Sequence, residues 1–277
     1  MRVGAHVPTR GRLARAIDYA EAIGADAIQL FVSNPRAWSP PSLRHAAVDE
    51  FRDRVEASTV GEVFVHSTYL INVASPDPAF HRRSIELAQA ELGGAAAIGA
   101  DGLVVHAGAG GAGERSEAIA RAAAAVREIA ALGGPPVLLE LTAGGAGAVA
   151  STIPQAAELL TAVNDPRVGL VLDTCHLLGA GYPLDDAEEA TRPFDELREL
   201  GLAERLGLVH GNDARDPRGA RRDRHEHPGL GTIGESGFRA VLADPLVRDR
   251  AILVETRGRE PEHTRDVAAL RELARSV

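Results

Sequence analysis

The sequence contains no lysine, because all 30 of its basic residues are arginine. Mechanisms that need a side-chain amine, such as Schiff-base lyases and lysine aldolases, are therefore excluded, and only the N-terminal amine remains to attack a carbonyl. The single cysteine, Cys175, rules out an internal disulfide and a zinc site built mainly from thiolates. Any catalytic chemistry must be carried by histidines, carboxylates and arginines.

Long apolar segments are also missing. No apolar run reaches the roughly 18 residues that a membrane-spanning helix needs, and the run after Met1-Arg2 is too short for a secretion signal. We therefore expect a soluble, cytoplasmic protein with no membrane partner. The net charge of −9 gives no general attraction to polyanions, so a nucleic acid would have to be met by local arginine clusters and metal ions.

Short apolar runs alternate about eight times with stretches of helical period, as in parallel strands joined by helices. The predicted strands are 2–6, 26–32, 61–66, 101–106, 136–140, 168–173, 206–210 and 251–255. The predicted helices are 11–23, 45–57, 78–98, 115–131, 153–163, 186–200, 235–243 and 261–275. Eight such units in 277 residues predict an α/β fold, a single (β/α)₈ TIM barrel domain over residues 1–277. An open doubly wound sheet is less favoured, since no glycine-rich fingerprint follows the first strand.

Two kinds of loop stand out between these elements. The glycine-rich stretches 108–113 and 144–147 lack the Lys and Ser/Thr of a phosphate-binding loop, and we interpret them as flexible connections. The longest irregular segment, 210–234, is rich in charge, and so long a loop in a barrel is usually functional. Its arginines form a candidate phosphate-binding patch: Arg215, Arg218, Arg221, Arg222 and Arg224.

Metal-binding side chains recur where the predicted strands end. Six strands end on His66, His106, Glu140, Asp173, His210 and Glu255. In a barrel these residues share the C-terminal face, where such enzymes keep their active sites, so we predict a metal site there. The loops that follow add His176, Asp223 and His225.

The number of these residues indicates more than one ion. A single strand-end His or Asp is usually a hydrogen-bonded or capping residue, but zinc takes about three or four protein ligands, so nine candidates favour two or three ions. Histidine mixed with carboxylates makes zinc the first choice and manganese the second. Cys175 lies between two candidate residues, yet a small buried packing residue is the favoured interpretation.

Clustered ions suit two chemistries. Two ions about 3.5–4 Å apart can share a hydroxide nucleophile for in-line attack on phosphorus, and a third can neutralise the departing oxygen. The same ligands can instead polarise a sugar carbonyl and hydroxyl for isomerisation. The ligands alone leave both reactions open.

Several motifs extend the pattern along nearly the whole chain. They are Gly4-Ala5-His6-Val7, Asn34-Pro35-Arg36-Ala37-Trp38, His66-Ser67-Thr68-Tyr69-Leu70-Ile71-Asn72, Glu140-Leu141-Thr142-Ala143-Gly144, Asp173-Thr174-Cys175-His176, His210-Gly211-Asn212-Asp213, Asp223-Arg224-His225 and Leu253-Val254-Glu255-Thr256. In this order and spacing the chain resembles the endonuclease IV family of apurinic/apyrimidinic (AP) endonucleases, which are xylose-isomerase-like barrels. The Asp-Thr-Cys-His and Asp-Arg-His signatures are specific.

The resemblance implies a hydrolase that cleaves the phosphodiester 5′ to an abasic site in damaged duplex DNA and leaves a 3′-hydroxyl. It implies three zinc ions, with manganese possible at one position, and a metal-bound hydroxide as the nucleophile. The implied ligand sets are His66, His106 and Glu140; Glu140, Asp173, His210 and Glu255; and His176, Asp223 and His225. Glu140 is thus the predicted catalytic residue that bridges the metals.

The resemblance also implies contacts with DNA. Arg36, Tyr69 and Leu70 match positions that enter the duplex at the damaged step, and we expect Arg222 and Arg224 to contact phosphates. An abasic nucleotide has no stacking partner, so its extrusion costs less than flipping a normal base, and an apolar wedge can fill the gap. A monomer is the expected state.

Some positions depart from the family pattern or stay open. Ala107, Gly211, Leu141 and Leu230 replace usual residues without removing a ligand, although the two leucines take the place of polar residues expected to support ligands. Such losses typically weaken metal affinity or activity about 10–100-fold. His6 is either a substrate contact or a hydrogen-bonded core residue. His227 is an alternative to His225, and three further histidines are expected at the surface: His45, His81 and His263.

Two other functions fit less well. A sugar isomerase or epimerase on the same barrel usually needs fewer metal ligands and no residues that enter DNA. A DNA-binding module with a structural metal is disfavoured because structural zinc sites are closed and rich in cysteine.

Overall fold

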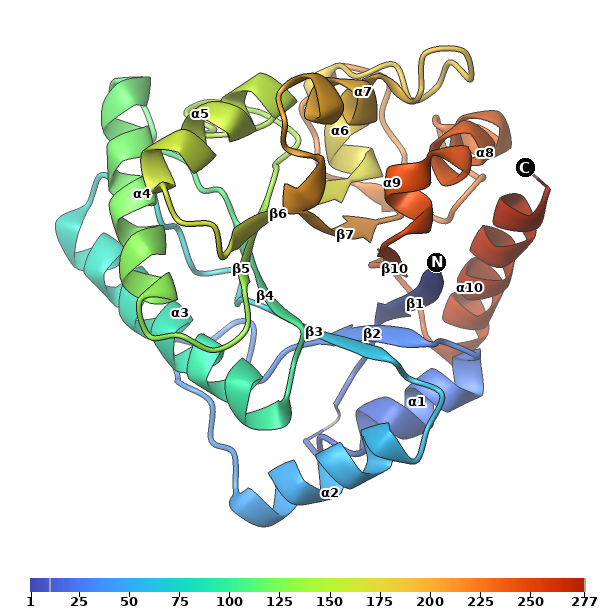
Figure 1. The fold of residues 1–277 in the computed structure, drawn as a ribbon, viewed down its shortest axis with the longest axis horizontal. Helices are drawn as coiled ribbons and strands as arrows, with labels where there is room; N and C mark the ends of the chain where they lie inside the picture. The colour runs from blue at the N-terminus through green and yellow to red at the C-terminus, as the bar shows by residue number, and fades with distance from the viewer. Residues whose placement is uncertain (10, 277) are drawn as a thin grey trace.

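A closed barrel of eight parallel strands forms the centre of the computed structural model, which describes residues 1–9 and 11–276 (Figure 1). The strands are β1 (Arg2–His6), β2 (Ala27–Leu30), β3 (Glu62–His66), β4 (Gly102–His106), β5 (Val137–Glu140), β6 (Val168–Asp173), β7 (Leu206–His210) and β10 (Ala251–Val254). Each pairs with its neighbours in this order, and β10 pairs with β1 to close the ring. The predicted barrel is confirmed.

Helices surround the strands as an outer ring (Figure 1). The helices that follow the strands are α1 (Arg15–Ile23), α2 (His45–Glu56), α3 (Pro78–Ile98), α4 (Arg115–Ala130), α5 (Ile153–Val163), α6 (Thr174–Ala180), α7 (Arg192–Glu199), α8 (Gly234–Ala243), α9 (Pro245–Arg248) and α10 (Glu260–Arg275). Packing of α10 beside α1 brings the two ends of the chain together. Among the described residues, no helix combines the length and apolar character that crossing a bilayer requires.

Local signals set where the helices begin and end. α3 begins directly after Asp77, whose carboxylate accepts hydrogen bonds from two N–H groups of the first turn, and it ends at Gly99 in the left-handed conformation. The helix predicted over 186–200 is shorter than expected, since α7 starts only at Arg192. Pro193 lies in its first turn, the position that best tolerates a residue without an N–H group.

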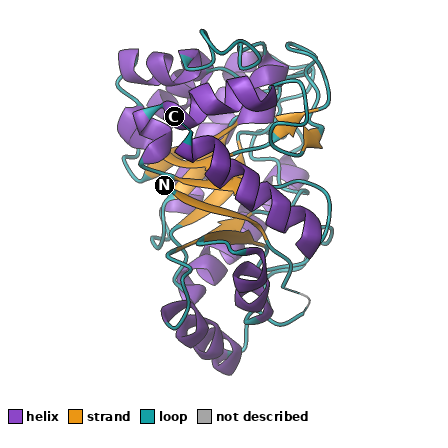
Figure 2. Ribbon diagram, turned by 90° about the vertical axis from the view of Figure 1, so that its right-hand side faces the viewer, coloured by secondary structure: helices purple, strands orange, loops and turns teal. Residues whose placement is uncertain are grey.

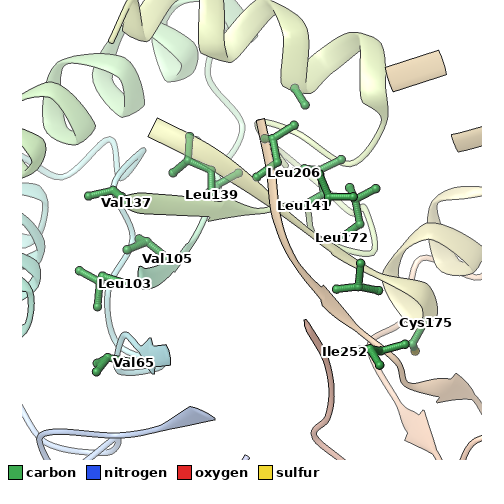
Figure 3. Packing of buried hydrophobic residues seen from close by; sticks show 14 of the residues in the cluster. Val65, Leu103, Val105, Val137, Leu139, Leu141, Leu172, Cys175, Leu206 and Ile252 are labelled. Carbon is green, nitrogen blue, oxygen red and sulfur yellow. The ribbon is translucent and has the colours of Figure 1, made fainter. Parts of the chain in front are cut away.

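Alternate strand residues build two apolar layers, because successive side chains of a strand point to opposite faces. The inner layer fills the barrel with Ala27, Phe64, Val104, Leu138, Val171, Leu208, Ala251 and Leu253. The outer layer packs against the helices, and Figure 3 shows part of it, with Leu103 and Val105 of β4 near Val137 and Leu139 of β5. A side chain two positions beyond an inner-layer residue therefore points into the barrel mouth.

The charged segment 210–234 contains more regular structure than predicted. β8 (Asp213–Ala214) and β9 (His225–Glu226) pair as an antiparallel ribbon apart from the barrel (Figure 2). The Asp213 carboxylate accepts hydrogen bonds from four backbone N–H groups of this segment, including that of Gly231 at 2.9 Å. This hairpin carries His225 back over the barrel mouth.

The two glycine-rich loops, 107–114 after β4 and 141–152 after β5, are paired with each other rather than being separate flexible connections. The N–H of Gly110 donates to the carbonyl oxygen of Gly147 at 2.7 Å, and Ala109 forms a bridge with Ala148. Gly147 has φ of 74°, and a Cβ added there would lie 2.3 Å from the carbonyl oxygen of Gly111. Only glycine fits this crossing.

Candidate metal centre

All eight barrel strands place a polar side chain in one layer at the C-terminal mouth. The layer consists of His6, Gln29, His66, His106, Glu140, Asp173, His210 and Glu255. Except for His6, each lies two positions beyond an apolar residue of the inner layer, so the strand period directs it into the mouth. The predicted strand-end ligands therefore share one layer.

Glu140 lies at the centre of this layer and is fully buried. Its Oε2 atom is 3.1 Å from Nε2 of His66 and 3.2 Å from Nε2 of His106. Its Oε1 atom is 3.2 Å from Nδ1 of His176 and 3.3 Å from Nδ1 of His210. Burial by itself would raise the pKa of Glu140, but the surrounding histidines hold it well below its usual range. The carboxylate thus stays ionised in the interior.

The nine predicted ligands come together in three groups, and within each group the ligand atoms lie within 4.8 Å of one another. The groups are His66, His106 and Glu140; Glu140, Asp173, His210 and Glu255; and His176, Asp223 and His225. This is the same division that the resemblance implied, with Glu140 shared by two groups. Cys175 also lies near Asp173 and His225. However, its side chain belongs to the outer apolar layer, and burial raises the pKa of its thiol to about 12.

Asp173 acts as a helix cap and as a member of the layer at the same time. Its Oδ1 accepts a hydrogen bond from the N–H of His176 at 3.0 Å, which caps α6. Its Oδ2 accepts a hydrogen bond from Asn212 Nδ2 at 2.6 Å and lies 3.5 Å from Nε2 of His225. The cap fixes His176 relative to Asp173, while the second oxygen faces the other ligands.

Carbonyl groups orient the histidine rings. His66 donates from Nδ1 to the Ser67 carbonyl at 2.7 Å, and His176 donates from Nδ1 to the Leu141 carbonyl at 2.9 Å. A carbonyl can only accept, so the proton of each neutral ring lies on Nδ1 and leaves Nε2 free to bind a metal. Leu141 therefore supports a ligand through its backbone, which any residue at this position would provide.

Gln29 belongs to the same layer, although it was not among the residues predicted from the sequence. Its buried amide accepts a hydrogen bond from His210 Nε2 at 3.0 Å and donates to Glu255 Oε1 at 2.6 Å. The same amide nitrogen lies 3.0 Å from Nδ1 of His6. Because Nε2 of a neutral His210 carries the proton that Gln29 accepts, its Nδ1 is unprotonated and faces the ligand layer. In the sequence, Gln29 can be recognised only as a polar residue inside the apolar run Ala27-Ile28-Gln29-Leu30.

Asn212 has a similar role after β7. Besides its bond to Asp173, its Oδ1 accepts a hydrogen bond from the N–H of Glu255 at 2.7 Å. One buried amide therefore joins two members of the layer. His6 is largely buried, and burial lowers its pKa against the opposing effect of Glu255. Its Nε2 has no hydrogen-bond partner, so His6 has features of both earlier interpretations.

The free nitrogens and the charge balance fit metal ions. Nε2 of His176 and Nε2 of His225 are buried without a hydrogen bond, although they lie 3.3 and 2.9 Å from Oδ1 of Asp223. In the described part of the chain, the four carboxylates of the three groups form ion pairs only with histidines. Imidazoles and carboxylates that converge without arginine are a donor set for zinc or a similar cation.

The carboxylates also act on the histidines. Burial lowers the pKa of His66, but the hydrogen bond to Glu140 and the charge of Glu255 outweigh it and raise the pKa to about 9. Burial likewise opposes the effect of Asp173 and Asp223 on His225, whose pKa is raised to about 9. The negative field of the site favours positive charge.

A cavity of about 560 Å³ lies over the ligand layer, and three of the predicted DNA contacts line it: Arg36, Tyr69 and Arg224. Tyr69 is 63% exposed, and its ring meets Phe31 edge-on at 5.3 Å. Leu70 is half-buried beside Tyr69, and Arg222 is exposed; neither lines the cavity. The cavity thus joins the metal ligands to an exposed aromatic ring and to arginines.

The predicted arginine patch is largely neutralised by acids. The pairs are Arg215–Glu226, Arg218–Asp185, Arg222–Asp216 and Arg224–Asp216. Three of these pairs lie within the loop and help to hold its shape, whereas Arg218 joins the loop to Asp185. Arg36 and Arg257, which also line the cavity, form no ion pair with any described residue and remain available to a phosphate.

Three neighbouring residues that the sequence singled out lie outside the three ligand groups. Leu230 is 75% exposed, so its side chain does not pack against the ligand layer. His263, expected at the surface, is buried and hydrogen-bonded to Tyr19 and to the Thr256 carbonyl. His227 bonds to Asp266 at 2.9 Å and belongs to none of the three groups.

Comparison with known proteins agrees with this geometry. Residues 17–275 match the model of the xylose isomerase-like TIM barrel family, and the chain belongs to that family. It is 37% identical to the probable endonuclease 4 of Streptomyces coelicolor over 284 residues, covering 98% of this chain and 94% of the relative. The crystal structure of endonuclease IV from Thermus thermophilus matches with a TM-score of 0.89 at 31% identity, over 100% of both chains. Within the barrel family, the chain is a member of the endonuclease IV family.

Likeness to sugar-converting enzymes is limited to the fold. A D-tagatose 3-epimerase-like protein matches with a TM-score of 0.71 at 20% identity, covering 100% of this chain and 96% of its own. At that identity the shared barrel carries no information about the reaction.

Proposed function

We propose that this protein is an AP endonuclease that hydrolyses the phosphodiester 5′ to an abasic site in duplex DNA and leaves a 3′-hydroxyl. The observation that best supports the proposal is the gathering of nine His, Asp and Glu side chains into three groups beneath the cavity of Arg36 and Tyr69. The names of the relatives agree with it. Residues 1–277 act as one domain, as a monomer and in the cytoplasm.

The three groups would hold three zinc ions, with manganese an alternative at one position. When bound, such ions supply Lewis acidity at the phosphate and an activated water for in-line attack. Glu140 belongs to two of these groups, and its burial keeps the shared carboxylate from moving. Asp173 and Asn212 lock the neighbouring ligands through their hydrogen bonds, so the site is ordered before substrate arrives.

Arg36 and Tyr69 act on the DNA. Tyr69 stands exposed above the ligands, where its ring and the adjacent Leu70 can fill the gap left by a missing base. The unpaired guanidinium of Arg36 binds the strand on the same rim. Arg222 and Arg224, which both pair with Asp216, add weaker phosphate contacts from the hairpin side. Extrusion of the abasic sugar then brings its phosphate into the cavity.

A sugar isomerase or epimerase is the alternative. The group of His176, Asp223 and His225 and the exposed ring of Tyr69 both weigh against it. A reaction on one small sugar needs neither a third group of ligands nor a large exposed aromatic at the rim.

The test is incision of a duplex oligonucleotide that carries one tetrahydrofuran abasic analogue. This analogue cannot undergo β-elimination, so cutting requires hydrolysis at phosphorus. We expect a product with a 3′-hydroxyl, loss of cutting after chelation, and recovery with zinc. His176→Ala should lower the rate more than about 100-fold, whereas the exposed His45→Ala should match the unmodified protein. No cutting by metal-replete protein would refute the proposal.

A further inference from the structure

Glu91 is a fully buried carboxylate outside the three ligand groups. It lies on α3, under the loops that follow β2 and β3. Burial raises the pKa of Glu91 to about 7, although hydrogen bonds from Ser33 and Thr68 oppose the shift. No arginine or histidine forms an ion pair with it among the described residues. A buried acid without a partner charge costs stability, so its position calls for a physical reason.

Each oxygen of Glu91 holds a different loop. Oε1 accepts a hydrogen bond from the hydroxyl of Ser33 at 2.5 Å, and Oε2 accepts one from the N–H of Thr68 at 3.2 Å. Ser33 lies three residues before Arg36, and Thr68 directly precedes Tyr69. One carboxylate therefore joins the two loops that carry the proposed DNA contacts.

Neighbouring turns of α3 support the same two loops. A Cβ added at Gly94 would meet Val32 at 3.2 Å and Pro41 at 3.3 Å, so the helix lies close against the loop after β2. Ser84 accepts a hydrogen bond from the N–H of Asn72 at 3.1 Å, which holds the loop after β3. Glu91 lies between these contacts and is bonded to both loops.

The two loops also touch through the half-buried ring of Phe31 and the exposed ring of Tyr69. Glu91 joins the same loops through Ser33 and Thr68, so two separate contacts fix the distance between them.

We propose that Glu91 is a positioning residue that sets the spacing of the Arg36 and Tyr69 loops and thereby the grip of the protein on DNA. This inference rests on the proposed function.

Neither oxygen of Glu91 bonds directly to a predicted metal ligand. The Thr68 N–H that it holds shares a peptide group with the Ser67 carbonyl that orients His66, but the N–H of Ser67 is itself anchored to the Val104 carbonyl at 2.8 Å. We therefore expect Glu91 to act on duplex binding more than on the hydrolysis itself.

Kinetics on two substrates test the proposal. Glu91→Ala, which removes both hydrogen bonds, should raise KM for the tetrahydrofuran duplex about 10-fold and change kcat less than about 3-fold. Hydrolysis of bis(p-nitrophenyl) phosphate, which is too small to span both loops, and the zinc content should stay unchanged. Glu91→Gln should restore KM, because its amide can donate to Ser33 and still accept from Thr68.

Ser33→Ala provides a milder second variant if Glu91→Ala does not fold, since it removes one bond and leaves the other. We expect a KM increase of about 3-fold. An unchanged KM, equal losses on both substrates, or a loss of zinc would overturn the positioning role. Failure of the unmodified protein to cut the duplex, while it still hydrolyses the small diester, would overturn the proposed DNA substrate and this inference with it.

Discussion

Replacing Gln29 with leucine should weaken metal binding while the barrel remains folded. The buried amide holds His210 through Oε1 and Glu255 through Nε2. Leucine is of similar size, so the packing changes little. Without the amide, the Nε2–H group of His210 is left buried without an acceptor, and its ring can rotate away from the ligand layer.

The expected magnitude follows from these two bonds. A neutral hydrogen bond contributes about 1 kcal/mol and one to a charged carboxylate about 1.5–3 kcal/mol. Loss of support for two ligands should then lower zinc affinity about 10–100-fold, or about 1.4–2.8 kcal/mol. The effect should be confined to the group of Glu140, Asp173, His210 and Glu255.

Chelator competition measures this affinity directly, and Ile28→Val is the matched control. Ile28 is the buried neighbour of Gln29 on the same strand and belongs to the outer layer. The control should lose about 0.5–1.5 kcal/mol of stability and keep its zinc affinity. Equal zinc affinity in Gln29→Leu and the unmodified protein would refute the orienting role of the amide, as would an equal loss in the control.

Two further outcomes are expected. Arg36→Ala should weaken binding of the abasic duplex and lower the slope of log affinity against log salt by about one. Arg224→Ala should have a smaller effect, because Asp216 already holds that guanidinium. An anisotropy titration that gives the two variants the same slope would contradict this difference. The pKa of Glu91 is raised from 4.5 to about 7 in the folded protein, so this carboxyl reduces stability increasingly as pH rises through that window. Urea unfolding should therefore show that the free energy of unfolding of Glu91→Gln, relative to that of the unmodified protein, rises by on the order of 3 kcal/mol between pH 4.5 and 7. If the difference in unfolding free energy between the two proteins stays constant over this range, the pKa of Glu91 is not raised.

The ligand layer could be predicted because the ends of apolar strands can be recognised from the sequence alone. A His, Asp or Glu that terminates an apolar run, as His106 and Glu140 do, is recognisable without any knowledge of the partner strands. Gln29 follows the same two-residue period, but it lies inside an apolar run and is uncharged. The period, rather than the residue type, was its signal.

Other features depend on contacts between distant parts of the chain. Tyr19 and His263 are 244 positions apart, and only the packing of α10 beside α1 brings them together and buries His263. The partners of the hairpin arginines are likewise fixed by folding, as in the pairing of Arg218 with Asp185. Charge composition could not reveal that these arginines already form ion pairs with carboxylates of the folded protein.

The paired glycine-rich loops have a consequence for how this barrel can change over time. The ladder between β4 and β5 continues past the ligands, with the N–H of Ala107 donating to the Glu140 carbonyl at 2.9 Å and that of Val149 to Gly108 at 3.0 Å. Rim loops of a barrel usually accept insertions one at a time. Here an added residue in either loop would shift the register of the other beside His106 and Glu140. Natural or engineered changes in the length of one loop must therefore be matched by changes in the other.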